Sequence, residues 1–201
     1  MKVKVYVEGG GDGKSLRARC RSGFSSFFEK ANLAGRMPQV IACGGREAAF
    51  DRFCTAFGSR RAEELIILLV DSEGPVADRS EPWLRLRERN GWEKPDDATD
   101  ENAHLMVQCM EAWFLADMDC LTAYFGQGFN RNALPGSPRI ENVAKDDVLE
   151  GLKRATRQCK KGEYGKGRHS FDMLETIDPA QVMVASPHAS RLVQTMREKA
   201  D

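Results

Sequence analysis

Three carboxylates stand where two predicted β-strands end. Glu8 ends a strand that starts near Val3. Asp71 ends the apolar run Leu65–Val70, and Glu73 follows two residues later. If the two strands are neighbours in a parallel sheet, their carboxyl ends bring the three side chains to one edge. Like charges held together cost free energy unless a cation offsets them, so the cluster predicts a hard metal ion, Mg²⁺ or Mn²⁺. The alternative is that they are ordinary strand-end and turn residues exposed to solvent.

A run of glycines follows Glu8. Gly9, Gly10 and Gly11 carry no side chains, so they leave open space and bare backbone amides beside the carboxylate. A phosphodiester can approach such a turn closely. The three glycines are therefore candidate substrate-binding residues, next to the acids that form the candidate catalytic group.

Part of the same turn matches a phosphate-binding P-loop, G-x-x-x-x-G-K-S/T. Gly13, Lys14 and Ser15 supply its second half, but Glu8 stands where its first glycine belongs. That carboxylate adds negative charge beside a polyphosphate, so a P-loop nucleotide-binding enzyme is the weaker alternative. Lys14 remains a candidate catalytic residue, because it lies near the glycine turn and can contact a phosphate.

Basic residues concentrate late in the chain. Residues 153–168, called the basic segment below, are rich in Lys and Arg, whereas residues 63–119 are rich in Asp and Glu. Lys166 and His169 lie in a glycine-containing loop, and we expect both to bind substrate. A phosphate backbone needs cations outside the reacting centre, which suits such a segment. The alternative is that these charges form solvated helix faces.

Glu111 follows a predicted strand at the start of a helix. It is a candidate fourth metal ligand, because that strand would end at the same edge as Asp71. The alternative is that its charge complements the helix dipole. We expect Trp113 and Phe114, which follow it, to be core residues rather than a platform for stacking bases.

The elements that would position these residues alternate between strands and helices. This order is typical of an α/β fold with a mostly parallel sheet flanked by helices. After about residue 130 every periodic segment is helical, which predicts a core at 1–130 and a helical extension packed on it at 131–201. The predicted strands are 3–8, 38–43, 65–71 and 104–108, and the first predicted helices span about 13–33 and 44–57.

The composition is that of a globular protein without a dominant charge. The chain has 201 residues, of which 41% are hydrophobic, and 30 basic residues balance 30 acidic ones. No apolar run approaches the ~20 residues of a membrane span, and Met1 leads into a strand rather than a signal peptide. The six cysteines form no CxxC pair. We therefore expect a cytoplasmic protein with reduced thiols and no membrane association.

Several segments resemble, in order, the signatures of the bacterial domain of unknown function 4276 family. This resemblance implies a Toprim-like (Rossmann-like) fold, since the family is placed in the Toprim-like superfamily. It also implies roles for three acids: Glu8 as general acid/base or metal ligand, and Asp71 and Glu73 as Mg²⁺ ligands. Ser72 between the two acids and a glutamate as the second acid depart from the usual pattern. The matching segments are Val7–Gly10, Leu69–Glu73, Gln108–Asp117, Tyr164–Gly167, Ile177–Pro179 and Ser186–Pro187.

The activity implied by the resemblance is Mg²⁺-dependent nuclease or phosphodiesterase action on DNA or RNA. Similar proteins are often encoded beside ATPases in bacterial defence settings, which implies an ATPase partner and an effector role in defence. The competing hypothesis is a non-catalytic regulatory or scaffold subunit of an ATPase complex.

Overall fold

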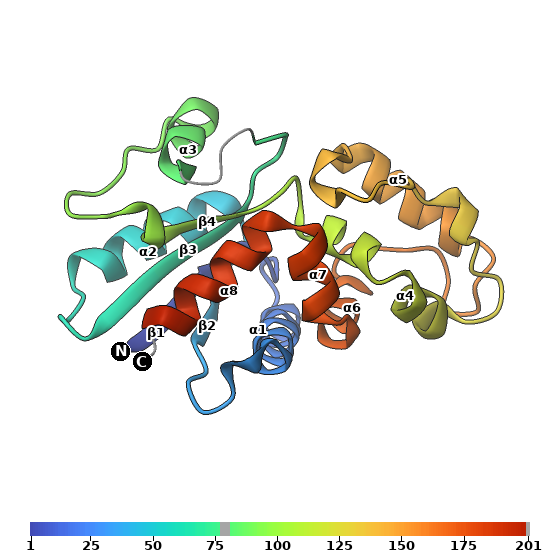
Figure 1. Cartoon of the computed structure of the whole chain (residues 1–201), viewed down its shortest axis with the longest axis horizontal. Helices are drawn as coiled ribbons and strands as arrows, with labels where there is room; N and C mark the ends of the chain where they lie inside the picture. Colours follow the sequence, from blue (N-terminus) through green and yellow to red (C-terminus); the bar gives the residue numbers. More distant parts are fainter. Residues whose placement is uncertain (77–80, 200–201) are drawn as a thin grey trace.

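The computed structural model describes residues 1–76 and 81–199. Within these residues the centre is a four-stranded sheet whose neighbouring strands are all parallel, in the order β2-β1-β3-β4 (Figure 1). The strands are β1 Lys2–Val7, β2 Gln39–Ala42, β3 Glu64–Asp71 and β4 Ala103–Met106.

The central strand β3 is apolar on both sides because helices cover both faces of the sheet. Ile67 and Leu69 pack with α1 (Lys14–Phe28) and α8 (Pro187–Lys199), whereas Ile66 and Leu68 pack with α2 (Arg46–Gly58) and α3 (Pro82–Asn90). A strand buried on both faces requires this near-continuous run of large apolar residues. The resulting three layers are visible in Figure 1.

The remaining helices gather beyond the carboxyl ends of the strands, at one end of the molecule (Figure 1). Their buried residues belong to the same hydrophobic cluster as α1 and one face of the sheet. The predicted division at residue 130 stays a prediction. These helices are α4 Met118–Phe125, α5 Lys145–Thr156, α6 Ser170–Thr176 and α7 Pro179–Ala185.

Short irregular helices link the regular elements. A π-helical turn (η1, Glu29–Leu33) ends α1, and Asn32 closes it in the left-handed region at φ +61°. The 3₁₀ turns are η2 Asp100–Asn102, η3 Met110–Ala116, η4 Arg131–Ala133 and η5 Ile140–Asn142.

The predicted fold class is confirmed: the protein is an α/β protein with a parallel sheet flanked by helices, consistent with a Rossmann-like or Toprim-like fold. Two details differ. β4 ends at Met106, two residues earlier than predicted, and α3 is not among the predicted elements. Trp113 and Phe114 are fully buried, so their prediction as core residues is confirmed. In the described part of the chain, no helix is both long enough and apolar enough to cross a membrane.

Candidate functional site

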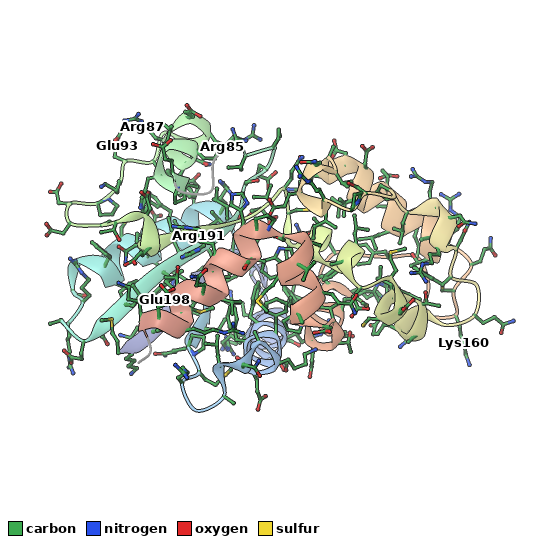
Figure 2. The ribbon with its side chains drawn as sticks, in the orientation of Figure 1. Arg85, Arg87, Glu93, Lys160, Arg191 and Glu198 are labelled. Carbon is green, nitrogen blue, oxygen red and sulfur yellow. The ribbon has the colours of Figure 1, made fainter. Side chains whose placement is uncertain are left out.

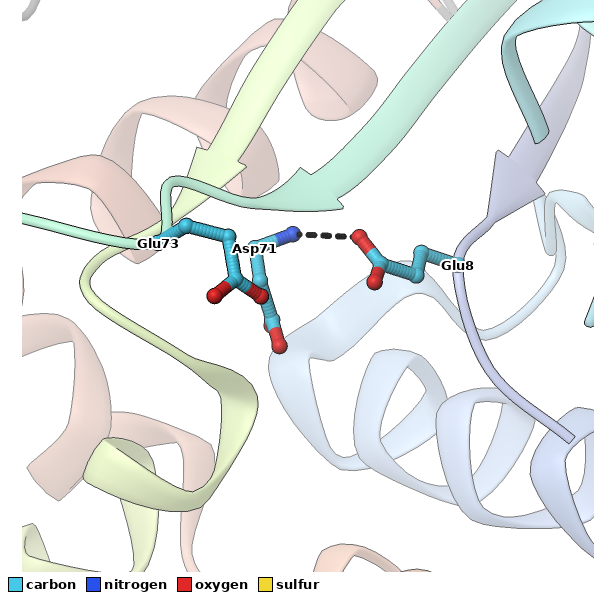
Figure 3. Close-up of side chains that lie close together, drawn as sticks. All are labelled: Glu8, Asp71 and Glu73. Carbon is cyan, nitrogen blue, oxygen red and sulfur yellow. Dashed lines mark hydrogen bonds between the residues drawn. The ribbon is translucent and has the colours of Figure 1, made fainter. Parts of the chain in front are cut away.

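The pairing of β1 with β3 places Glu8 beside Asp71. Val7 is in register with Leu69, and the Glu8 amide donates to the Leu69 carbonyl at 2.9 Å. The Glu8 side chain then turns toward β3, where its Oε2 accepts a hydrogen bond from the Asp71 amide at 3.2 Å (Figure 3). The two predicted strand-end acids are therefore neighbours, as parallel adjacent strands require.

A tight turn after β3 brings Glu73 to the same place. Its backbone is left-handed at φ +58°, a conformation that costs a non-glycine residue free energy and recurs at functional sites. Two bonds hold the turn: the Glu73 amide donates to the Gln108 carbonyl at 3.0 Å, and the Ser72 hydroxyl donates to Gly74 O at 2.6 Å. One oxygen from each of Glu8, Asp71 and Glu73 lies within 4.8 Å of the others (Figure 3).

The three acids differ in how far they are buried. Asp71 is 3% exposed, and its Oδ1 accepts the Met110 amide at 2.9 Å. Burial raises the pKa of Asp71 to about 7. The positive charge of Lys166 opposes this shift, whereas the negative charge of Glu8 adds to it. Burial also raises the pKa of Glu8, although Arg46 opposes the shift. Two carboxyls with raised pKa values are typical of functional sites.

Glu73 behaves differently from the other two acids. Burial acts to raise its pKa, but the hydrogen bond and charge of Lys145 outweigh burial and hold the pKa below its usual range. Lys145 Nζ lies 2.5 Å from Glu73 Oε1. Glu73 is therefore the acid of the trio that stays ionised most readily.

Arg46 is a residue of the candidate site that sequence reasoning missed. It begins α2 directly after β2, and its guanidinium donates to Glu8 Oε2 at 3.1 Å and to the Asp71 carbonyl. Asn90 accepts a further bond at 2.7 Å, and the guanidinium lies 5.1 Å from the Trp92 ring centre. These contacts fix Arg46 and thereby fix the direction of the Glu8 carboxylate.

Glu111 faces a lysine rather than the three acids. It is 0% exposed, and the Tyr164 hydroxyl donates to its Oε1 at 3.3 Å. Its Oε2 has no hydrogen-bond partner and lies 3.6 Å from Lys166 Nζ. Lys166 Nζ also lies 3.7 Å from Asp71 Oδ2, between the two acids. Among the described residues the group of candidate metal ligands comprises Glu8, Asp71 and Glu73, so the placement of Glu111 favours a role in holding Lys166.

A cavity of about 260 Å³ opens beside the acids. Its lining includes Glu8, Asp71 and Lys166 together with the glycines that follow β1. The expectation of bare amides is wrong for Gly9, because its N–H donates to the Gly44 carbonyl at 2.8 Å. Gly10 serves close packing as well: a Cβ there would lie 2.8 Å from the Arg17 Cα. The glycines thus let the turn lie against α1 while keeping this side of the cavity free of side chains.

The structure does not bring every candidate residue to this cavity. Lys14 is exposed at the first residue of α1 and is not part of the described lining. His169 is buried, accepts the Gly165 amide on Nδ1 at 3.1 Å, and packs edge-on to Phe125. It shapes the loop that presents Lys166 and is likewise absent from the described lining.

Most of the basic segment lies away from the acids. Lys153 pairs with Glu150 at 2.8 Å, and the Lys161 ammonium lies 4.1 Å from the Tyr124 ring centre. Lys160 points outward at the end of the molecule farthest from the sheet (Figure 2). Of the basic residues predicted there to bind substrate, the structure places Lys166 at the carboxylates.

The donor set suits a hard divalent cation. It consists of carboxylate oxygens, and the hydrogen bonds to Glu8, Asp71 and Glu73 described here engage one oxygen of each. The other oxygen of each acid makes no hydrogen bond described here and can serve as a ligand, and a bound cation would favour the ionised forms of Asp71 and Glu8, whose pKa values burial raises. Mg²⁺ and Mn²⁺ prefer such oxygen ligands.

These features define an α/β protein with an acidic site at the carboxyl ends of its central strands. Residues 7–197 match the model of a family described as a domain of unknown function (DUF4276), and the chain belongs to this family. The resemblance of its segments to that family is thereby confirmed. No curated protein matches the chain, and no solved structure matches it.

Proposed function

We propose that the protein is a divalent-metal-dependent phosphodiesterase that cleaves DNA or RNA, with a Toprim-like site. The observation that carries the proposal is the convergence of Glu8, Asp71 and Glu73, with ligand oxygens within 4.8 Å, beside a cavity that also contains Lys166. Carboxylates that lie close together and partly away from water cost free energy. Their presence beside basic groups therefore supports a catalytic role.

Each residue has a role in this proposal. Glu8 accepts or donates the proton, since its raised pKa brings it closer to neutrality. Asp71 and Glu73 hold the cation, and Arg46 orients Glu8. A bound Mg²⁺ would polarise the phosphate and lower the pKa of an attacking water. Lys166 and the glycine turn bind the phosphate backbone.

The setting of the protein is part of the proposal. The six cysteines are free thiols, which fits a reducing cytoplasm. Family resemblance suggests an ATPase partner and an effector role in bacterial defence. A non-catalytic subunit of such a complex would keep the fold and show no turnover.

Glu8→Gln tests the proposal. The change is nearly isosteric and removes the proton-transfer group, so cleavage of DNA or RNA in Mg²⁺ or Mn²⁺ should fall by at least about 10²-fold. The melting temperature should change little. Glu163→Gln is the matched control, because Glu163 is half-exposed and pairs with Arg157. Full activity of Glu8→Gln, or no metal-dependent cleavage by the wild type with or without an ATPase, would contradict the proposal.

A further inference from the structure

The acidic site contains one basic partner for each of its three candidate metal ligands. Arg46 lies 3.1 Å from Glu8, Lys166 lies 3.7 Å from Asp71, and Lys145 lies 2.5 Å from Glu73. The three basic groups come from the start of α2, the start of α5 and the loop before α6. Each of the three carboxylates therefore already has one positively charged partner.

The three basic groups differ in how firmly they are held. Arg46 is fixed by Glu8, the Asp71 carbonyl, Asn90 and the face of Trp92. Lys166 is 55% exposed, and its distances of 3.6 and 3.7 Å to the two acids are charge contacts rather than hydrogen bonds. It lies between Gly165 and Gly167, and Gly167 has φ +82°. Arg46 is part of the frame, whereas Lys166 can move.

Lys145 is also free to exchange partners. Its described contact is the ion pair with Glu73, made by the flexible end of a side chain at the first residue of α5. A lysine ammonium is a compact charge on a long stem, and it can turn to a new anion without moving the helix.

We propose that Lys145 and Lys166 act as latches: each pairs with its acid until a divalent cation binds, and then binds the phosphate oxygens of the substrate. This inference rests on the proposed metal-dependent function. A divalent cation among Glu8, Asp71 and Glu73 repels an ammonium within 4 Å, so both lysines leave their acids when the cation arrives. Lys166 lines the cavity and Lys145 pairs with an acid of the same cluster, so the released ammonium groups can supply the positive charge that a phosphodiester requires.

Glu111 explains why Lys166 stays at the cavity after its release. Its Oε2 is fully buried without a hydrogen-bond partner, and it faces the Lys166 ammonium at 3.6 Å. A buried unpartnered carboxylate oxygen costs free energy, so it retains a nearby cation. Glu111 is thus a positioning residue that keeps Lys166 over the cavity while Asp71 binds the metal.

Direct Mn²⁺ binding tests the latch without requiring turnover. Isothermal titration of the full chain compares the wild type with Lys145→Met and Lys166→Met, which keep the apolar stems and remove the charges. Both variants should bind Mn²⁺ at least about tenfold more tightly, because a competing positive charge is gone. Lys166→Arg keeps the charge and should bind Mn²⁺ like the wild type. Lys2→Met, at the amino end of β1 on the opposite edge of the sheet, should have no effect.

A second readout is the binding of a short single-stranded DNA in Mn²⁺, measured in a Glu8→Gln background that cannot cleave it. It should weaken in both Lys→Met variants although their Mn²⁺ affinity rises, and circular dichroism checks that the variants fold. Unchanged or weaker Mn²⁺ binding in both variants overturns the latch. If Mn²⁺ then still binds the wild type and is lost in Glu73→Gln, the proposed metal site survives that failure. Absence of Mn²⁺ binding in the wild type and both variants overturns the latch and the metal site together.

Discussion

The strand-end site and the basic segment are both densely charged, yet they are built in opposite ways. In the site, the ion pairs join elements far apart in sequence: Arg46 with Glu8, Lys145 with Glu73, and Lys166 with Asp71. In the rest of the basic segment, the described pairs are local: Lys153 with Glu150 and Arg157 with Glu163. Tertiary structure creates the first set of pairs, whereas proximity in the sequence creates the second.

Burial separates the two regions as sharply. The side chains of Asp71 and Glu111 are 5% and 0% exposed, whereas those of Lys153 and Glu150 are 43% and 56% exposed. Exposed pairs contribute little to stability, and water solvates their charges whether or not they meet. Buried acids are costly, so their presence requires an explanation that a surface pair does not. The cost of burying charge, rather than the number of charged residues, therefore distinguishes the candidate site from the basic segment.

The glycines of the two regions also differ, and we expect their substitution to have the largest effect on stability. Gly10 in the site and Gly162 in the basic segment both have left-handed backbones, at φ +86° and +82°. A Cβ at Gly10 would lie 2.8 Å from the Arg17 Cα, whereas the nearest atom to one at Gly162 is an Arg168 nitrogen at 3.6 Å.

Gly10→Ala and Gly162→Ala should each lose about 1–2 kcal/mol from the left-handed backbone. Gly10→Ala should lose roughly 1–3 kcal/mol more, because α1 cannot yield to the new methyl group without a backbone shift. At about 2–4 °C for each kcal/mol, thermal denaturation resolves the two variants. Equal melting temperatures would mean that the turn can move away from α1, and that its glycines serve the cavity alone.

The sheet and its acidic edge could be predicted from sequence for one shared reason. A continuous apolar run that ends in Asp71 indicates a central strand, and parallel topology then places its end beside Glu8. The position of Glu73 also follows, because a turn can rotate a side chain that strand alternation would point away. Short-range rules predict the two strand ends, whereas the pairing of β1 with β3 that brings them together is a property of the fold.

The basic partners could be predicted only in part. Arg46 follows Gly44 and Gly45 directly after β2, so the same edge rule places it at the site once β2 is known to adjoin β1. Lys145 carries no such signal, since its position depends on how α5 packs on the rest of the protein. The basic segment suggests a binding surface by composition, but composition cannot show that Lys166 turns inward while Lys160 points outward.

The cost of burying Asp71 predicts a pH dependence of intermediate size. Its pKa is about 7 in the folded protein, above its ordinary value of 3.8. The folded protein therefore binds the proton more tightly than the unfolded chain. Between about pH 4 and 7 this contribution to the free energy of unfolding decreases as pH rises. Asp71→Asn keeps an oxygen for the Met110 amide and removes the titration.

The melting temperature of Asp71→Asn relative to the wild type should therefore increase from pH 4 to pH 7 and level off above it, when both are measured in EDTA. Glu163→Gln in the basic segment should show no such trend, because Glu163 lies at the surface. A constant difference between Asp71→Asn and the wild type across this range would show that Asp71 ionises in the fold without cost. The difference in burial between the two regions would then not correspond to a difference in the free energy of ionisation.

The smallest expected effect concerns nucleic-acid binding, and it compares the two regions most directly. Each Lys that contacts a phosphate releases counterions, so its loss should reduce the slope of log affinity against log salt concentration by about 1. We expect this reduction for Lys145→Ala and for Lys166→Ala, measured by fluorescence anisotropy with a short labelled DNA in Mn²⁺, in a Glu8→Gln background that cannot cleave it. The variant that replaces Lys153, Lys160 and Lys161 with Ala removes three charges from the basic segment. It should leave the slope nearly unchanged, because the described contacts of these side chains do not include the acids. A larger change of slope in the triple variant than in the single ones would reverse the assignment: the exposed segment would then bind the nucleic-acid backbone, and the ion pairs of Lys145 and Lys166 would serve the fold alone.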